Sequence, residues 1–202
     1  MRRILLAVSL VVSLPEPVSG QGLLFGPAAG VTSSSLAGDF LTEPNPYQQR
    51  AGLAAGIAAE LSFAKLIAVA GSALFVQKGA RQKPAQSYPT MRITYLEIPL
   101  TVRIKAGLSR RLRWFGEGGG APAIEIACSA EEVGCHNMRT EKVDIGLVAG
   151  SGLQLKVLDT WFTLSARYTW GVKNLAGGFP SGEVKNRSIL VLLGAAWGAA
   201  GS

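Results

Sequence analysis

Apolar and polar side chains alternate one by one over long stretches of this chain. In residues 94–105, "TYLEIPLTVRIK", the even positions form an aliphatic face, and Glu97, Arg103 and Lys105 fall on the other face. Because successive side chains of a strand point to opposite faces, this segment predicts a strand with one apolar and one ionic side. The same period recurs, clearly or weakly, in seven further segments: 22–33, 50–62, 65–77, 112–127, 143–155, 161–170 and 189–197.

The connections between these eight predicted strands alternate strictly between long and short. Long polar stretches such as "CSAEEVGCHNMRTE" are each followed by a short one such as "KVLDT". Short periplasmic turns and longer outer loops are typical of barrels in bacterial outer membranes. The sequence therefore predicts an all-β fold, a closed up-and-down antiparallel transmembrane β-barrel of eight strands in the bacterial outer membrane.

The ionic faces of the strands are predicted to line the lumen of this barrel. An eight-stranded barrel has an interior just wide enough to be filled by side chains, so charges inside it need partners. We therefore expect a lumen ion network in which acidic and basic side chains pair. The strand positions fix the face of each member but not the pairs: Glu60, Glu97 and Asp144 on the acidic side, and Arg103, Lys105 and Arg167 on the basic side.

Pro99 lies in the middle of the predicted strand 94–105. Proline has no N–H to donate to a neighbouring strand, and a closed barrel has no free edge where this would not matter. Pro99 is therefore expected at a bulge or at a locally unpaired position.

Aromatic residues are placed where a membrane interface would lie. Phe162 lies at one end of the apolar face of its strand, and Tyr168 and Trp170 lie at the other end. Trp197 occupies the apolar face near the end of the last strand. These four residues are predicted to form aromatic girdles that flank an apolar band.

The N-terminal residues 1–20 have two arginines, a short apolar run and small residues at the end, which predicts a signal peptide followed by a barrel domain over 21–202. The longest later apolar run, 66–76, is too short for a membrane-spanning helix. The net charge of +7 is scattered, apart from a group at 110–113, and no aromatic ladder accompanies it, so nucleic acid is not an expected partner.

Cys128 and Cys135 fall in one predicted outer loop. An exported protein meets an oxidising compartment, so a disulfide between them is expected, with free thiols as the alternative. Together with His136 they offer three possible metal ligands, but without a zinc-site spacing, and no metal or cofactor is predicted. His136, the single histidine, could serve as a base beside Ser129 or a carboxylate. A solvated loop residue is the preferred interpretation, and the chain is not expected to be an enzyme.

Four short motifs resemble the PorT-like family of outer-membrane β-barrel proteins. They are "YLEIPL" at 95–100, a "KG" at 78–79 that ends the third strand, a "D-G---G-G" pattern that begins at Asp144, and an "RY--G--N" pattern that begins at Arg167. The resemblance implies an eight-stranded barrel, mostly without assigned activity; a few relatives serve in protein secretion or gliding machinery. Outer-membrane strands often end on an aromatic residue, and Trp197 matches this, although "GAAGS" follows it.

The predicted function is a structural or interaction role, with partners bound through the outer loops or the rim, and not an open general pore. Membrane lipids, and other envelope proteins, are the expected partners; the sequence identifies no small-molecule ligand. Two alternatives stay open: a barrel enzyme that modifies lipid with His136 as base, and a soluble periplasmic barrel that encloses an apolar ligand as lipocalins do.

Overall fold

The computed structural model describes residues 22–38, 47–82, 91–130, 143–172 and 184–198. These residues form nine β-strands: β1 (Gly22–Gly38), β2 (Tyr47–Ser62), β3 (Ile67–Gln82), β4 (Met91–Glu97), β5 (Leu100–Gly107), β6 (Leu112–Ala130), β7 (Val143–Val157), β8 (Thr160–Gly171) and β9 (Val184–Ala196). No helix in this part of the chain is long and apolar enough to cross a membrane. The predicted signal peptide, residues 1–20, lies outside the described residues and stays a prediction.

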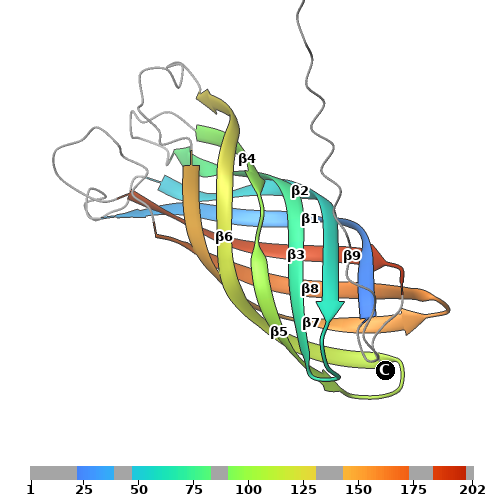
Figure 1. Cartoon of the computed structure of the whole chain (residues 1–202). Helices are drawn as coiled ribbons and strands as arrows, with labels where there is room; N and C mark the ends of the chain where they lie inside the picture. Colours follow the sequence, from blue (N-terminus) through green and yellow to red (C-terminus); the bar gives the residue numbers. More distant parts are fainter. Residues whose placement is uncertain (1–21, 39–46, 83–90, 131–142, 173–183, 199–202) are drawn as a thin grey trace, which may run out of the picture.

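The strands close into one antiparallel barrel (Figure 1). Each strand pairs with its neighbours in the chain, and β9 returns to pair with β1 from Ala28↔Gly194 to Gly38↔Val184. β4 and β5 are two parts of one strand, since both lie between β3 and β6. The predicted eight-stranded, closed, up-and-down barrel is therefore confirmed.

The break between β4 and β5 lies at Ile98 and Pro99. The pairing with β3 keeps one register across it, because Leu74 pairs with Glu97 and Gly71 with Leu100. The Ser72 N–H donates to the Pro99 carbonyl at 3.2 Å, but proline cannot return the bond. Pro99 is thus a locally unpaired position, one of the two predicted outcomes; the bulge of this strand is elsewhere, between Thr94 and Tyr95 in the pairing with β6.

A second proline weakens the other side of the same strand. The Ile98 N–H donates to the Pro122 carbonyl of β6 at 2.9 Å, and Pro122 likewise has no N–H to return. Each of the two pairs therefore keeps one hydrogen bond where a regular ladder has two. The wall stays closed here, with fewer hydrogen bonds on both sides of the fourth strand.

The short turns all lie at one end of the barrel. Residues 63–66, 108–111 and 158–159 connect β2 to β3, β5 to β6 and β7 to β8, and β9 ends near the same rim (Figure 1). The four longer connections leave from the opposite rim, as predicted. By the rule for outer-membrane barrels, the short turns mark the periplasmic end.

The two faces of the wall have opposite character. Leu100, Val102 and Ile104 point outward and are 58%, 52% and 64% exposed, whereas Arg103 and Lys105, on the inner face, are 6% and 2% exposed. A soluble barrel would bury the apolar set and expose the charges. The predicted arrangement, with apolar side chains outside and charges inside, is confirmed.

Candidate functional site

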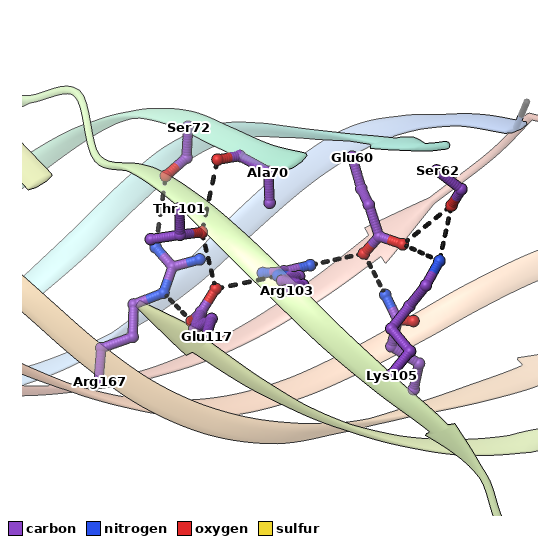
Figure 2. Close-up of polar contacts among 10 residues, drawn as sticks. Glu60, Ser62, Ala70, Ser72, Thr101, Arg103, Lys105, Glu117 and Arg167 are labelled. Atoms are coloured by element: carbon purple, nitrogen blue, oxygen red, sulfur yellow. Dashed lines mark hydrogen bonds and ion pairs between the residues drawn. The ribbon is translucent and has the colours of Figure 1, made fainter. Parts of the chain in front are cut away.

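The lumen contains a buried chain of ion pairs that crosses the barrel (Figure 2). It runs from Arg167 on β8 to Glu117 on β6, then to Arg103 on β5, Glu60 on β2 and Lys105 on β5. Its members come from strands that the closed barrel brings together, and every one of them is at most 7% exposed. We call these five residues the lumen ion network.

Glu117 joins two arginines. Its Oε1 accepts from Arg167 Nε at 2.6 Å, and its Oε2 accepts from Arg103 Nε at 2.9 Å. The Thr101 hydroxyl also donates to Oε2 at 3.1 Å. The Glu117 side chain is fully buried, so these bonds replace the water that the carboxylate would otherwise bind.

Glu60 is the second acceptor. It receives Arg103 Nη1 at 2.7 Å, Lys105 Nζ at 3.0 Å and Gln154 Nε2 at 2.9 Å. Lys105 donates a further bond to Ser62 Oγ at 2.6 Å. Arg103 therefore binds both carboxylates and is the centre of the network.

Neutral side chains support the network. The Arg103 guanidinium lies 4.3 Å from the centroid of the Phe115 ring, a cation–π arrangement. Space for that ring comes from Gly152 on β7, where a Cβ atom would lie 2.5 Å from Phe115 Cζ. The glycine on one strand thus allows the aromatic ring that supports Arg103 on another.

A separate ion pair lies farther along β3, toward the long connections. Lys78 Nζ contacts Glu97 Oε2 and lies 5.7 Å from the centroid of the Tyr95 ring. Asp144 lies in the same row across the sheet, because Glu97 pairs with Ala123 and Ala123 pairs with Asp144. Within the described residues Asp144 forms no ion pair, and its Oδ1 has no hydrogen-bond partner.

The six residues expected in the lumen all lie inside the barrel, in two groups. Glu60, Arg103, Lys105 and Arg167 belong to the lumen ion network, whereas Glu97 pairs instead with Lys78. Glu117 and Lys78 are lumen ions that the alternation of side chains did not predict. Lys78 was noted only as part of the "KG" motif, and the only signal for Glu117 was its alternation with Ile124 and Ile126 in a glycine-rich segment.

A small cavity of about 50 Å³ adjoins the network. Glu60, Arg103, Arg167 and Gln154 line one part of it, and apolar side chains such as Leu192 line the rest. Gln154 Oε1 has no protein partner. A cavity of this size has room for a few water molecules, which would satisfy such an atom, but not for a passage through the barrel.

This arrangement holds charge in place and has no described catalytic group. Both network carboxylates are bound by cations, which leaves neither positioned as a general base. Within the described ranges, no three histidine, cysteine or acidic side chains are placed to hold a metal ion. His136 and Cys135 lie outside the described residues, so the lipid enzyme and the disulfide with Cys128 stay predictions.

The predicted aromatic residues face outward at the two ends of the wall. Phe162 and Trp197 are 47% and 46% exposed near the short turns, and Trp170 is 45% exposed toward the other rim. Tyr168 and Trp170 are in edge contact, with ring centroids 4.3 Å apart. Their positions at both borders of the apolar wall fit the two interfaces of a membrane.

Comparisons with known proteins agree with this fold. The sequence model of the family described as outer membrane protein beta-barrel domain matches residues 15–177. Among solved structures, the chain is similar to the outer membrane protein OprG from Pseudomonas aeruginosa, with a TM-score of 0.58 and 13% identity over 89% of this chain and 96% of OprG. At this identity the likeness concerns the fold alone.

Two other solved structures are more distant. Neisserial surface protein A matches with a TM-score of 0.49 and 11% identity over 90% of this chain and 97% of its own. Ail, the attachment invasion locus protein of Yersinia pestis, matches with a TM-score of 0.45 and 15% identity. The match covers 89% of this chain and 100% of Ail. A search of curated protein sequences gave no match.

Proposed function

Because the chain belongs to the outer membrane protein beta-barrel domain family and resides in the bacterial outer membrane, we propose that it acts as a structural or interaction barrel that binds partners at its outer rim and is not an open general pore. The observation that carries the proposal is the lumen ion network. A pore of this strand number would need a free lumen, and here buried ion pairs cross it. The function then resides on the outer surface and the loops.

The length of the strands supports a role for the outer rim. A tilted strand needs about 9–11 residues to cross a membrane, whereas β1, β3 and β6 have 17, 16 and 19 residues. On the loop side the outward face becomes polar over β1 to β4 and β9, whereas Val143 and Val172, at the loop ends of β7 and β8, are apolar and exposed. Ser33 Oγ donates to Gln49 Oε1 at 3.3 Å on this face. We call this zone the polar collar: Ser33, Gln49, Gln77, Arg92 and Arg187.

The polar collar fits a wall that rises above the bilayer. A lipid-facing wall would stay apolar to its end, because polar side chains in hydrocarbon are costly. The wall below the polar collar is apolar, as Val102 and Leu147 illustrate. A partner that approaches from outside would therefore meet the polar collar.

Planar-bilayer conductance tests the closed lumen. We expect the refolded full chain to give no steady open-channel steps, and we expect an Arg103→Ala/Glu117→Ala variant to give measurable leakage. Large, stable conductance of the unmodified barrel would refute the proposal that it is not a pore.

Site-specific photocrosslinking in cells tests the interaction role. A crosslinking residue at Arg92 of the polar collar should give a discrete protein adduct, and the same residue at Val102 in the apolar band should give lipid adducts only. Protein adducts at neither position would contradict a partner at the rim.

The PorT-like resemblance remains the finer proposal for the subtype. It is supported by the positions of its motif residues, since Lys78, Glu97, Asp144 and Arg167 all lie inside the lumen. The enzyme alternative would be tested by His136→Ala and the lipid composition of the cell envelope, which should not change. The lipocalin-like alternative does not agree with an ion-lined lumen in a membrane-embedded barrel.

A further inference from the structure

A groove lies on the outside of the barrel at the end with the short turns. Arg110 and Arg111 of the β5–β6 turn form one side, and Leu155, Lys156 and the residues that follow it, 157–158, form the other. The Lys156 N–H donates to the Arg111 carbonyl at 2.8 Å, which fixes the two turns beside each other. The groove is therefore built by the fold and not by one turn alone.

The groove is strongly basic. Arg110 and Arg111 are exposed and form no ion pair with any described residue. Two further cations of this rim face inward, since the Arg113 guanidinium is 4.3 Å and Lys156 Nζ 6.0 Å from the ring of Trp161, which is buried on the inner face. Asp159 is the one acidic residue of the two turns, so the exposed Arg110 and Arg111 outnumber the acidic side chains there.

The groove is also apolar on the side that continues into the wall. Leu155 and Val157 point outward and are 44% and 45% exposed, in line with the lipid-facing side chains of β7. Leu158 at the tip of the turn is 89% exposed and has a φ of +54°, in the region that favours glycine or asparagine. The positive φ follows from the two-residue hairpin loop, because Val157 pairs with Thr160 and such loops favour φ > 0 at their first residue. The exposed leucine side chain extends the apolar surface of the groove to the tip of the turn.

We propose that this groove binds an anionic phospholipid of the periplasmic leaflet, with its phosphate between Arg110 and Arg111 and an acyl chain along Leu155 and Val157. The charge of the groove favours an anion, and its continuity with the lipid-facing wall favours a lipid over an acidic protein or free phosphate. The proposal rests on the outer-membrane location and is independent of any partner at the opposite rim. In this proposal the two short turns select lipids by the charge of their headgroups.

Native mass spectrometry of the full chain in detergent, titrated with phosphatidylglycerol and with phosphatidylethanolamine, tests the proposal. Each arginine near an anionic membrane surface strengthens the binding affinity by about five-fold. We expect Arg110→Ala to weaken phosphatidylglycerol binding by about five-fold, and Arg110→Ala/Arg111→Ala by about thirty-fold, with little change for phosphatidylethanolamine.

Lys65→Ala is the matched control, because Lys65 is an exposed cation on the β2–β3 turn of the same rim and does not line the groove. An equal loss for Lys65→Ala, or equal binding of the two lipids, would overturn the proposal in favour of general charge attraction. Inorganic phosphate at millimolar concentration should not displace the lipid; displacement would indicate a plain phosphate site. Val157→Thr, which keeps the β-branched shape that suits a strand, should fold and still bind phosphatidylglycerol more weakly, whereas unchanged affinity would exclude the apolar contact.

Discussion

Lys78 and Glu97 contact each other inside the barrel from β3 and β4, although 19 residues separate them in the chain. Both are almost fully buried, at 4% and 2% exposure, and Asp144 lies two strands away in the row of Glu97. The pair thus places a buried cation beside the acids of this part of the lumen. Its removal would leave carboxylates without a partner.

Reversal of this pair is our first prediction. Lys78→Glu should lower the free energy of unfolding by about 3–5 kcal/mol, because it places a third acid beside Glu97 and Asp144. Lys78→Glu/Glu97→Lys should restore at least about 1 kcal/mol of that loss. Urea unfolding in phospholipid vesicles measures these two variants and Glu97→Lys alone, and strictly additive effects of the two single changes would show that the two side chains do not interact.

Glu117→Gln should destabilise the barrel by about 3 kcal/mol. Arg167 would lose the carboxylate that it binds, and Arg103 would lose one of its two carboxylate partners. Glu125→Gln is the matched control on the same strand, because Glu125 forms no ion pair with a described residue and its Oε2 has no partner. We expect the control to change stability by less than about 1 kcal/mol. The temperature at which each variant loses its compact form on gels provides the readout. Equal losses for the two glutamates would contradict a special role of Glu117.

Gly152→Ala should cost about 1–3 kcal/mol, because its methyl group would lie 2.5 Å from both Phe115 Cζ and the Leu164 carbonyl oxygen. Gly120→Ala should be tolerated, since nothing lies within 4 Å of the added atom. The yield of refolded barrel and its unfolding midpoint in urea measure the difference. A fully stable Gly152→Ala barrel would mean that the Phe115 ring is free to move away from Arg103.

Pro99→Ala should add the missing hydrogen bond of the fourth strand. The new amide N–H would face the carbonyl of Ser72. The N–H of Ser72 already donates to the carbonyl of residue 99 at 3.2 Å. Hydrogen exchange followed by NMR should show this new amide protected to a degree similar to the Ile98 amide, which donates to the Pro122 carbonyl in both forms. Rapid exchange at residue 99 would mean that the strand is distorted for a reason other than the proline ring.

The local pattern predicted most of the wall. Leu100, Val102 and Ile104 were placed on the outer face from alternation alone, because a pleated strand sends successive side chains to opposite sides whatever its neighbours are. The alternation of long and short connections indicated closure in the same local way. Pro99 was recognised as a defect because its missing N–H is a property of the residue itself.

The same pattern failed where both faces have similar character. In the segment around Lys78 the preceding residues are apolar on both sides, since the lumen also contains an apolar cluster to which Leu74 and Val76 belong. Around Glu117, glycines on both faces removed the contrast between them. Alternation carries information only when the two environments select different side chains, and here they did not.

The sequence by itself therefore determined that this chain forms a barrel with hydrocarbon outside and charge inside, because that choice depends on a period of two residues along each strand. Only the tertiary structure decided that Arg103 joins Glu60 to Glu117, and that Glu97 binds Lys78. Those pairs depend on the register and curvature of the closed sheet, which bring together residues as much as 43 positions apart.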